Sequence, residues 1–157
     1  MNRIFLVLFL FYYSLVFCQD INDENSKRAY TEVYGKCFKN LKPIEETKDI
    51  IPINKNVKFC SLYQCVSRIE YASENKEIEQ AILKRAIEIT TLLYNEGTPI
   101  YLLTGMDSSG TEFVENKNLS DDNNLVYIAV AECITSKSLE KIKDIVNKQT
   151  LQLINKK

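Results

Sequence analysis

The side chains best suited to chemistry are carboxylates that gather in one polar stretch, at Asp107, Glu112, Glu115, Asp121 and Asp122. Two carboxylates can hydrolyse a glycosidic bond when burial raises the pKa of one of them. Carboxylates and loop carbonyls can also bind calcium, but the ligand spacing of an EF-hand is absent here. Because acidic residues are mostly exposed in any domain, we interpret the stretch as a solvated loop and a candidate binding surface. Asp107 and Glu112 as a catalytic pair are the alternative.

Several other chemistries are excluded by residue type. The sequence contains no histidine, which removes Ser-His-Asp and Cys-His catalysis as well as histidine metal sites. Gly105 and Gly110 have the spacing of a phosphate-binding loop, but Thr111 stands where that loop needs a lysine. We therefore interpret this segment as a turn after a strand, and we predict neither a cofactor nor a metal.

The N-terminus has the pattern of a signal peptide. Arg3 precedes an apolar run over residues 4–17, which is shorter than the ~20 residues of a membrane-spanning helix. Bulky Phe17 disfavours lipid attachment at Cys18, so we predict cleavage after Cys18, with residues 1–18 as the signal peptide and 19–157 as one exported domain. A lipid on Cys18, or a retained membrane anchor, is the alternative.

The predicted mature chain keeps an even number of cysteines: Cys37, Cys60, Cys65 and Cys133. In an exported protein this number indicates two disulfides, which can pair in three ways. We favour Cys37–Cys60 and Cys65–Cys133, because these pairs would join separate elements. The spacing of Cys60 and Cys65 fits neither a redox C-x-x-C motif nor a zinc knuckle, so a reactive thiol or a metal site is the weaker interpretation.

Apolar periodicity predicts four helices. They cover residues 29–41, 59–72 (where a strand is the alternative), 75–96, and a last helix that begins after Ser136 as its N-cap. Gly97 and Pro99 mark the end of the third helix. Tyr94 and Tyr101 flank the Gly97 turn, and we expect them to form an exposed aromatic pair that belongs to the binding surface.

The strands are predicted at residues 100–104 and 125–132, with a possible third at 111–115. The first and last are apolar at alternating positions on both sides, so we expect both faces of each to be buried. The predicted fold class is α+β, with a small two- or three-stranded sheet packed under four helices. A three-layer α/β arrangement is the alternative.

These observations favour a binding protein over an enzyme. The formal net charge is −1, so the chain has no basic field to attract nucleic acid, and we expect membrane contact only through the signal peptide or a lipid. We predict a periplasmic or secreted, non-enzymatic domain that binds a protein or a small ligand. A small carboxylate-dependent hydrolase of envelope polysaccharide is the alternative function.

Overall fold

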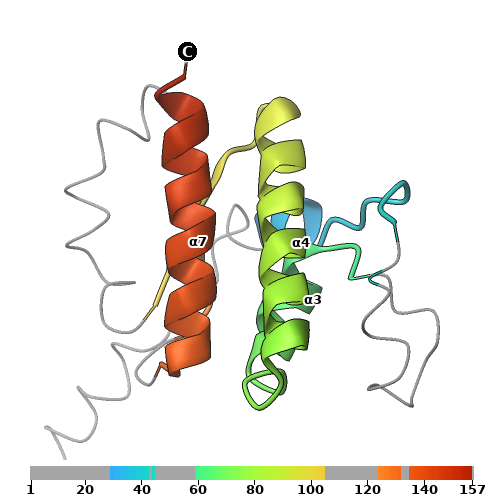
Figure 1. Ribbon diagram of the computed structural model, residues 1–157. Coiled ribbons are helices and arrows are strands. Elements are labelled where there is room, and N and C mark those ends of the chain that lie inside the picture. The colour runs from blue at the N-terminus through green and yellow to red at the C-terminus, as the bar shows by residue number, and fades with distance from the viewer. Residues whose placement is uncertain (1–28, 43, 45–58, 105–123, 132–134, 157) are drawn as a thin grey trace, which may run out of the picture.

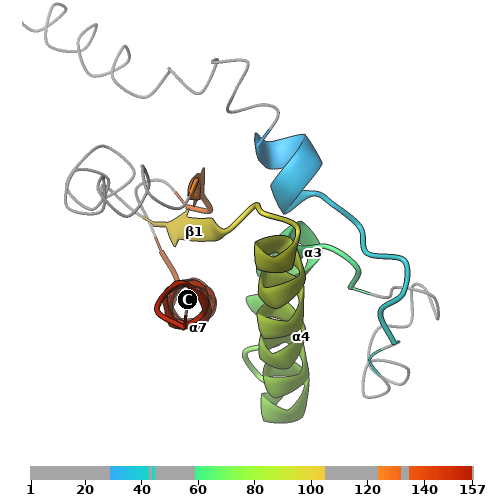
Figure 2. The same ribbon diagram turned by 90° about the horizontal axis from the view of Figure 1, so that it is seen from above.

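The protein has a small α+β fold, as the sequence predicts. The computed structural model describes residues 29–42, 44, 59–104, 124–131 and 135–156. In chain order its elements are η1 (Ala29–Tyr34), α3 (Leu62–Ile69), α4 (Lys76–Asn95), β1 (Ile100–Leu103), β2 (Val126–Ala129) and α7 (Lys137–Ile154). The two long helices, α4 and α7, lie side by side, and α3 packs against both (Figure 1). Seen from above, α7 is viewed end-on and lies beside β1, with which it is in contact (Figure 2).

The helix ends follow the capping signals in the sequence. The side chain of Asn75 accepts hydrogen bonds from the N–H groups of Glu77 (3.0 Å) and Ile78 (3.2 Å), which begins α4. After α4, Gly97 has φ +81°, the left-handed conformation that a glycine adopts without strain. Ser136 caps α7 through its hydroxyl group, as predicted.

The first helix is shorter than predicted. The expectation was a helix over 29–41, but the structure has one π-helical segment, η1, in which the N–H of Gly35 donates to the carbonyl of Tyr30 at 2.8 Å. Beyond η1 the chain bonds to the residues just before α3, because the N–H of Phe38 donates to the carbonyl of Cys60 at 2.8 Å. The apolar residues after η1, Phe38 and Leu41, therefore pack on the core from a segment without regular secondary structure.

The two strands pair in parallel, with Ile100 opposite Val126 and Leu103 opposite Ala129. All four residues of β1 are buried, which confirms the prediction for this strand. The prediction is wrong for β2, where only Ile128 is buried and the other residues are half-buried. Helices α7 and α4 pack against β1, whereas besides β1 the main element in contact with β2 in the described part of the chain is the short η1 segment. The possible third strand, 111–115, lies outside the described residues.

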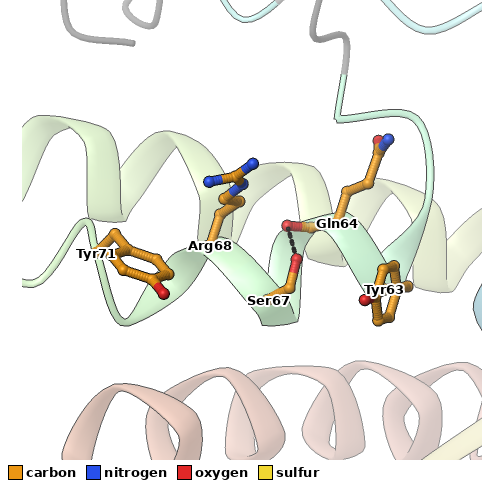
Figure 3. Close-up of a pocket in the computed structure, with 5 residues that line it drawn as sticks. All are labelled: Tyr63, Gln64, Ser67, Arg68 and Tyr71. Carbon is orange, nitrogen blue, oxygen red and sulfur yellow. Dashed lines mark hydrogen bonds between the residues drawn. The ribbon is translucent and has the colours of Figure 1, made fainter. Parts of the chain in front are cut away.

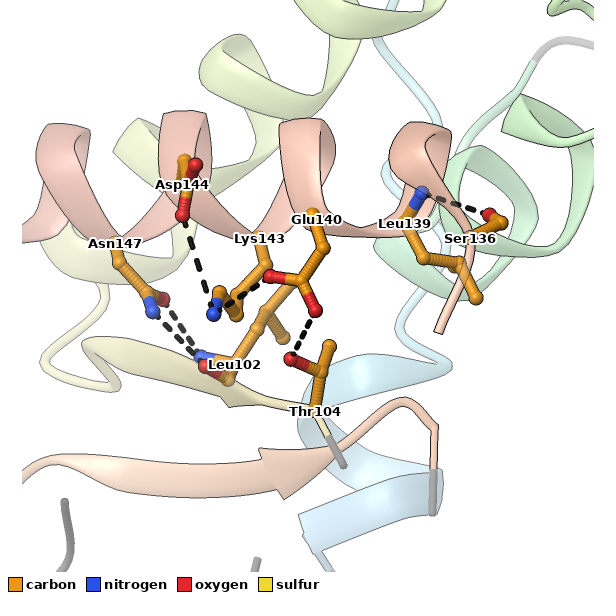
Figure 4. A network of polar contacts seen from close by, with 8 residues as sticks. All are labelled: Leu102, Thr104, Ser136, Leu139, Glu140, Lys143, Asp144 and Asn147. Carbon is orange, nitrogen blue, oxygen red and sulfur yellow. Dashed lines mark hydrogen bonds and ion pairs between the residues drawn. The ribbon is translucent and has the colours of Figure 1, made fainter. Parts of the chain in front are cut away.

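Side chains of α7 seal the edge of β1 that faces away from β2 (Figure 4). The N–H of Leu102 donates to Oδ1 of Asn147 at 2.7 Å, and Nδ2 of Asn147 donates back to the carbonyl of Leu102 at 2.9 Å. The Thr150 hydroxyl donates to the carbonyl of Ile100 at 2.8 Å. The side-chain amide of Asn147 thus takes the place of a neighbouring strand and satisfies buried backbone groups.

Apolar side chains from α3, α4, α7 and both strands form the core. Arg85 is a cation that is buried beside this apolar core, and its side chain is 5% exposed. One of its terminal nitrogens donates to the carbonyl of Lys42 and its Nε lies 3.4 Å from Glu88. Among the helices that the structure describes, none is both long and apolar enough to cross a membrane.

Candidate functional site

Helix α3 and the turn after it expose a tyrosine-rich and arginine-containing surface, which we call the α3 face. It lines a hollow of about 420 Å³ and consists of Tyr63, Gln64, Ser67, Arg68 and Tyr71 (Figure 3). Tyr63 and Tyr71 are 56% and 81% exposed, and in the described part of the chain they are the exposed large hydrophobic residues. None of the five residues carries a carboxylate or an amine.

The sequence dictates which side of α3 faces solvent. Leu62, Cys65, Val66 and Ile69 are buried on one side of the helix. On the other side, residues 63, 67 and 71 follow one another four apart, as do residues 64 and 68, and residues four apart lie next to each other on a helix. The result is two short, adjacent rows of polar and aromatic side chains.

The start of α3 is held by a disulfide and two side-chain hydrogen bonds. Cys37 and Cys60 form the predicted disulfide, which is thereby confirmed. The hydroxyl of Ser61 accepts from the N–H of Gln64 (3.3 Å), and Oε1 of Gln64 accepts from the N–H of Cys60 (2.7 Å). This reciprocal arrangement resembles a capping box, and it fixes the side chain of Gln64 within the α3 face.

A chain of edge-to-face aromatic contacts supports Tyr63 from behind. The ring centroids of Tyr30 and Tyr34 are 5.7 Å apart, and those of Tyr34 and Tyr63 are 5.6 Å apart. Tyr34 is buried, and burial raises the pKa of its phenol well above the usual range. Such ring contacts stabilise by about 0.5–1.5 kcal/mol each, so Tyr63 is positioned before any partner arrives.

Cys65 is a free, buried thiol, which corrects the predicted pairing with Cys133. Cys133 lies outside the described residues. Cys65 belongs to the inward side of α3, where it fills the apolar core. Burial is the largest cause that raises its pKa to about 12, so at neutral pH the side chain is a thiol and a poor nucleophile.

The predicted aromatic pair at the Gly97 turn is wrong as an exposed feature. Tyr101 is buried as part of β1, and its ring lies 5.7 Å from that of Tyr127. The hydroxyl of Tyr94 donates to the carbonyl of Leu153 at 3.1 Å, which ties the end of α4 to the end of α7. Both tyrosines therefore pack between elements.

The predicted carboxylate surface lies outside the described residues. This applies to Asp107, Glu112, Glu115, Asp121 and Asp122. The hydrolase hypothesis on Asp107 and Glu112 therefore stays a prediction.

A second polar cluster lies where β1 ends, around Glu140 (Figure 4). The Thr104 hydroxyl donates to one oxygen of Glu140 at 2.8 Å, and the amine of Lys143 lies 2.8 Å from the other. The hydrogen bond from Lys143 is the largest cause that lowers the pKa of Glu140 to about 2. A carboxylate that stays ionised in this way cannot donate a proton at neutral pH, so we interpret the cluster as structural.

A second hollow, of about 380 Å³, lies between residues 38–41 and the C-terminal part of α4. Lys36 pairs with Glu96 at 2.5 Å and lies over the ring of Phe38, 5.4 Å from its centroid. Glu88 is also paired, with Arg85. Because most charges at this hollow are already paired, it is a weaker candidate than the α3 face. In the part of the chain that the structure describes, no group of side chains could hold a metal ion.

Sequence reasoning missed the α3 face because it considered only the apolar side of the segment 59–72. The usable signal was the four-residue spacing of Tyr63, Ser67 and Tyr71 opposite that side.

No family model, curated protein or solved structure matches the chain. The function is therefore argued from the site itself.

Proposed function

We propose that this protein is an exported, non-enzymatic binding domain that holds a partner protein through the α3 face. The observation that carries this proposal is the exposure of Tyr63 and Tyr71 beside Arg68 on α3 and the turn that follows it. Tyrosine and arginine are enriched among the residues that dominate interface energies. Tyrosine offers a large contact area at a low cost in conformational entropy. Lysine and glutamate, which are depleted at such surfaces, do not line this one.

Export to the periplasm or out of the cell is supported by two features. The first is the predicted signal peptide, residues 1–18. The second is the Cys37–Cys60 disulfide, since disulfides persist mainly in oxidising compartments. A lipid on Cys18 is the lesser possibility.

A binding role is also favoured by the state of the reactive groups. Cys65 is buried as a thiol, and Glu140 is ionised and paired. Neither is arranged as a nucleophile or as a general acid. The exposed side chains of the α3 face suit contact with another surface instead.

The proposal is tested by site-specific photo-crosslinking in the cells that make the protein. A photoreactive phenylalanine analogue replaces Tyr71, and in a control strain it replaces exposed Lys148 on α7. We expect one protein to be cross-linked from position 71 and not from position 148, as identified by mass spectrometry. With that partner purified, Tyr63→Ala should weaken its binding by about 2 kcal/mol, or about thirtyfold. Equal labelling from both positions, or capture of a second copy of this chain, would contradict the proposal.

A further inference from the structure

The row formed by Gln64 and Arg68 presents hydrogen-bond donors to solvent. Oε1 of Gln64 is already occupied by the N–H of Cys60 (2.7 Å), which leaves the two N–H bonds of its amide. The guanidinium of Arg68 carries only donors, and it has no ion-pair partner among the described residues. Figure 3 shows both side chains projecting from the same side of α3. A ligand that fits this row must offer acceptor atoms.

The charge of the α3 face and the planar shape of the Arg68 guanidinium indicate which chemical group of a ligand fits this row. Arg68 is the one cation of the α3 face, and none of the other four lining residues is charged. A planar guanidinium matches the two oxygens of a carboxylate in a bidentate pair. Nucleic acid and anionic membranes are bound by clusters of several cations, which this face does not have. A single carboxylate neutralises the face.

We propose that the α3 face recognises an aspartate or glutamate side chain of the partner protein. The carboxylate receives two hydrogen bonds from Arg68 and a third from the amide of Gln64. Tyr63 and Tyr71 contact the apolar atoms on either side of it and exclude water from the ion pair. This inference rests on the proposed function and specifies the chemistry of the partner.

The probe for the test is a random linear peptide library, selected on the purified, disulfide-bonded protein. Selected peptides are made synthetically, and their affinities are measured by calorimetry or NMR titration. We expect the peptides to share an aspartate or glutamate, and its replacement by the neutral amide to weaken binding at least about tenfold, since charge-assisted hydrogen bonds are the strong ones. Peptides that lack acidic residues, or a selection that yields no binder to the α3 face, would overturn the proposal.

Three variants connect the acidic residue with Arg68. Arg68→Gln should bind the peptide with the acidic residue no more tightly than the peptide with the neutral amide. Arg68→Lys should keep a reduced preference for the acidic peptide, because it retains the positive charge but lacks the planar guanidinium that binds both carboxylate oxygens. Lys148→Gln, a matched loss of an exposed cation on α7, should change nothing. Thermal unfolding checks that each variant folds. An unchanged acid preference in Arg68→Gln would overturn the proposal.

Two further results separate this inference from the proposed function. A uronic acid oligosaccharide carries the same carboxylate on a sugar, and tighter binding of that probe than of every selected peptide would overturn the assignment to a protein partner. If the partner captured from position 71 is lost with Tyr63→Ala but retained at full affinity with Arg68→Gln, the proposed function stands and this inference fails. If neither change affects capture, both fail.

Discussion

The amide of Asn147 is the clearest place where one side chain determines the stability of the fold. Asn147 is 7% exposed, and it satisfies both the N–H and the carbonyl of Leu102, which is fully buried. The substitution Asn147→Ala removes both hydrogen bonds and leaves two backbone groups of β1 without partners. No other side chain of the described residues contacts these two groups by a hydrogen bond.

The expected cost follows from those two groups. A buried donor or acceptor without a partner costs about 1–3 kcal/mol, so the pair costs about 2–6 kcal/mol. Alanine is the better helix former and returns about 0.5 kcal/mol. For a chain of this size, 1 kcal/mol corresponds to about 2–4 °C in Tm. We therefore expect Asn147→Ala to lower Tm by about 3–20 °C.

Calorimetry of the variant, together with hydrogen exchange at the Leu102 amide, measures this effect. Gln152→Ala serves as the control, since Gln152 is exposed on the same helix and its replacement by alanine also gains some helix propensity without removing a buried hydrogen bond. Asn147→Asp should fall between the two, because it keeps an acceptor for the N–H of Leu102 but sets a carboxylate against its carbonyl. A Tm for Asn147→Ala equal to that of Gln152→Ala, with the Leu102 amide still protected, would refute the reasoning.

Three further outcomes test other parts of the structure. Replacing Cys37 and Cys60 by serine opens a loop with a sequence separation of 23 residues, and by the chain-entropy estimate it should lower the free energy of unfolding by about 3 kcal/mol in denaturant titrations. Because the folded pKa of Glu140 is about 2 and its usual value is 4.5, its contribution to stability is present above pH 4.5 and is lost as the pH falls towards 2. The side chain is 39% exposed, so Glu140→Gln should remove less than about 1 kcal/mol of that acid dependence, and an unchanged acid profile would count against the Lys143 pair. Cys65 should resist iodoacetamide at neutral pH and react only when the protein unfolds, and mass spectrometry that finds rapid native labelling would contradict its burial.

Local signals in the sequence predicted the long elements. Asn75 and Ser136 cap the helices that follow them, and Gly97 ends α4 where its missing side chain permits a positive φ. Strand β1 was recognisable from four consecutive apolar residues. Each of these features is decided by neighbours within a few positions, and this is why the sequence alone reveals them.

Features that depend on distant contacts were not predictable in the same way. The residues after η1 are held by Cys60, which lies far along the chain, forms the disulfide with Cys37 and accepts a hydrogen bond from the N–H of Phe38 at its carbonyl. The burial of Tyr101 depends on its position inside β1 and on Tyr127 in the neighbouring strand. Periodicity marks an apolar or a polar side, but it does not say which element will cover it.

Because hydrogen bonds from side chains satisfy backbone groups of the sheet, a helix offers the better surface for a partner. The edge of β1 that faces α7 is closed by Asn147 and Thr150, and at β2 the hydroxyl of Tyr30 donates to the carbonyl of Ala129. A partner strand therefore finds little free backbone along these groups. The α3 face differs, because its backbone is satisfied within the helix and only its side chains remain to form contacts. Gln64 contributes to helix capping and to recognition. Its Oε1 accepts the hydrogen bond from the N–H of Cys60, and its N–H groups are left to donate to a partner. Stability and specificity at this site consequently depend on the same hydrogen bond, and Gln64→Glu, which offers no outward donor, should impair recognition of a carboxylate while the helix cap remains.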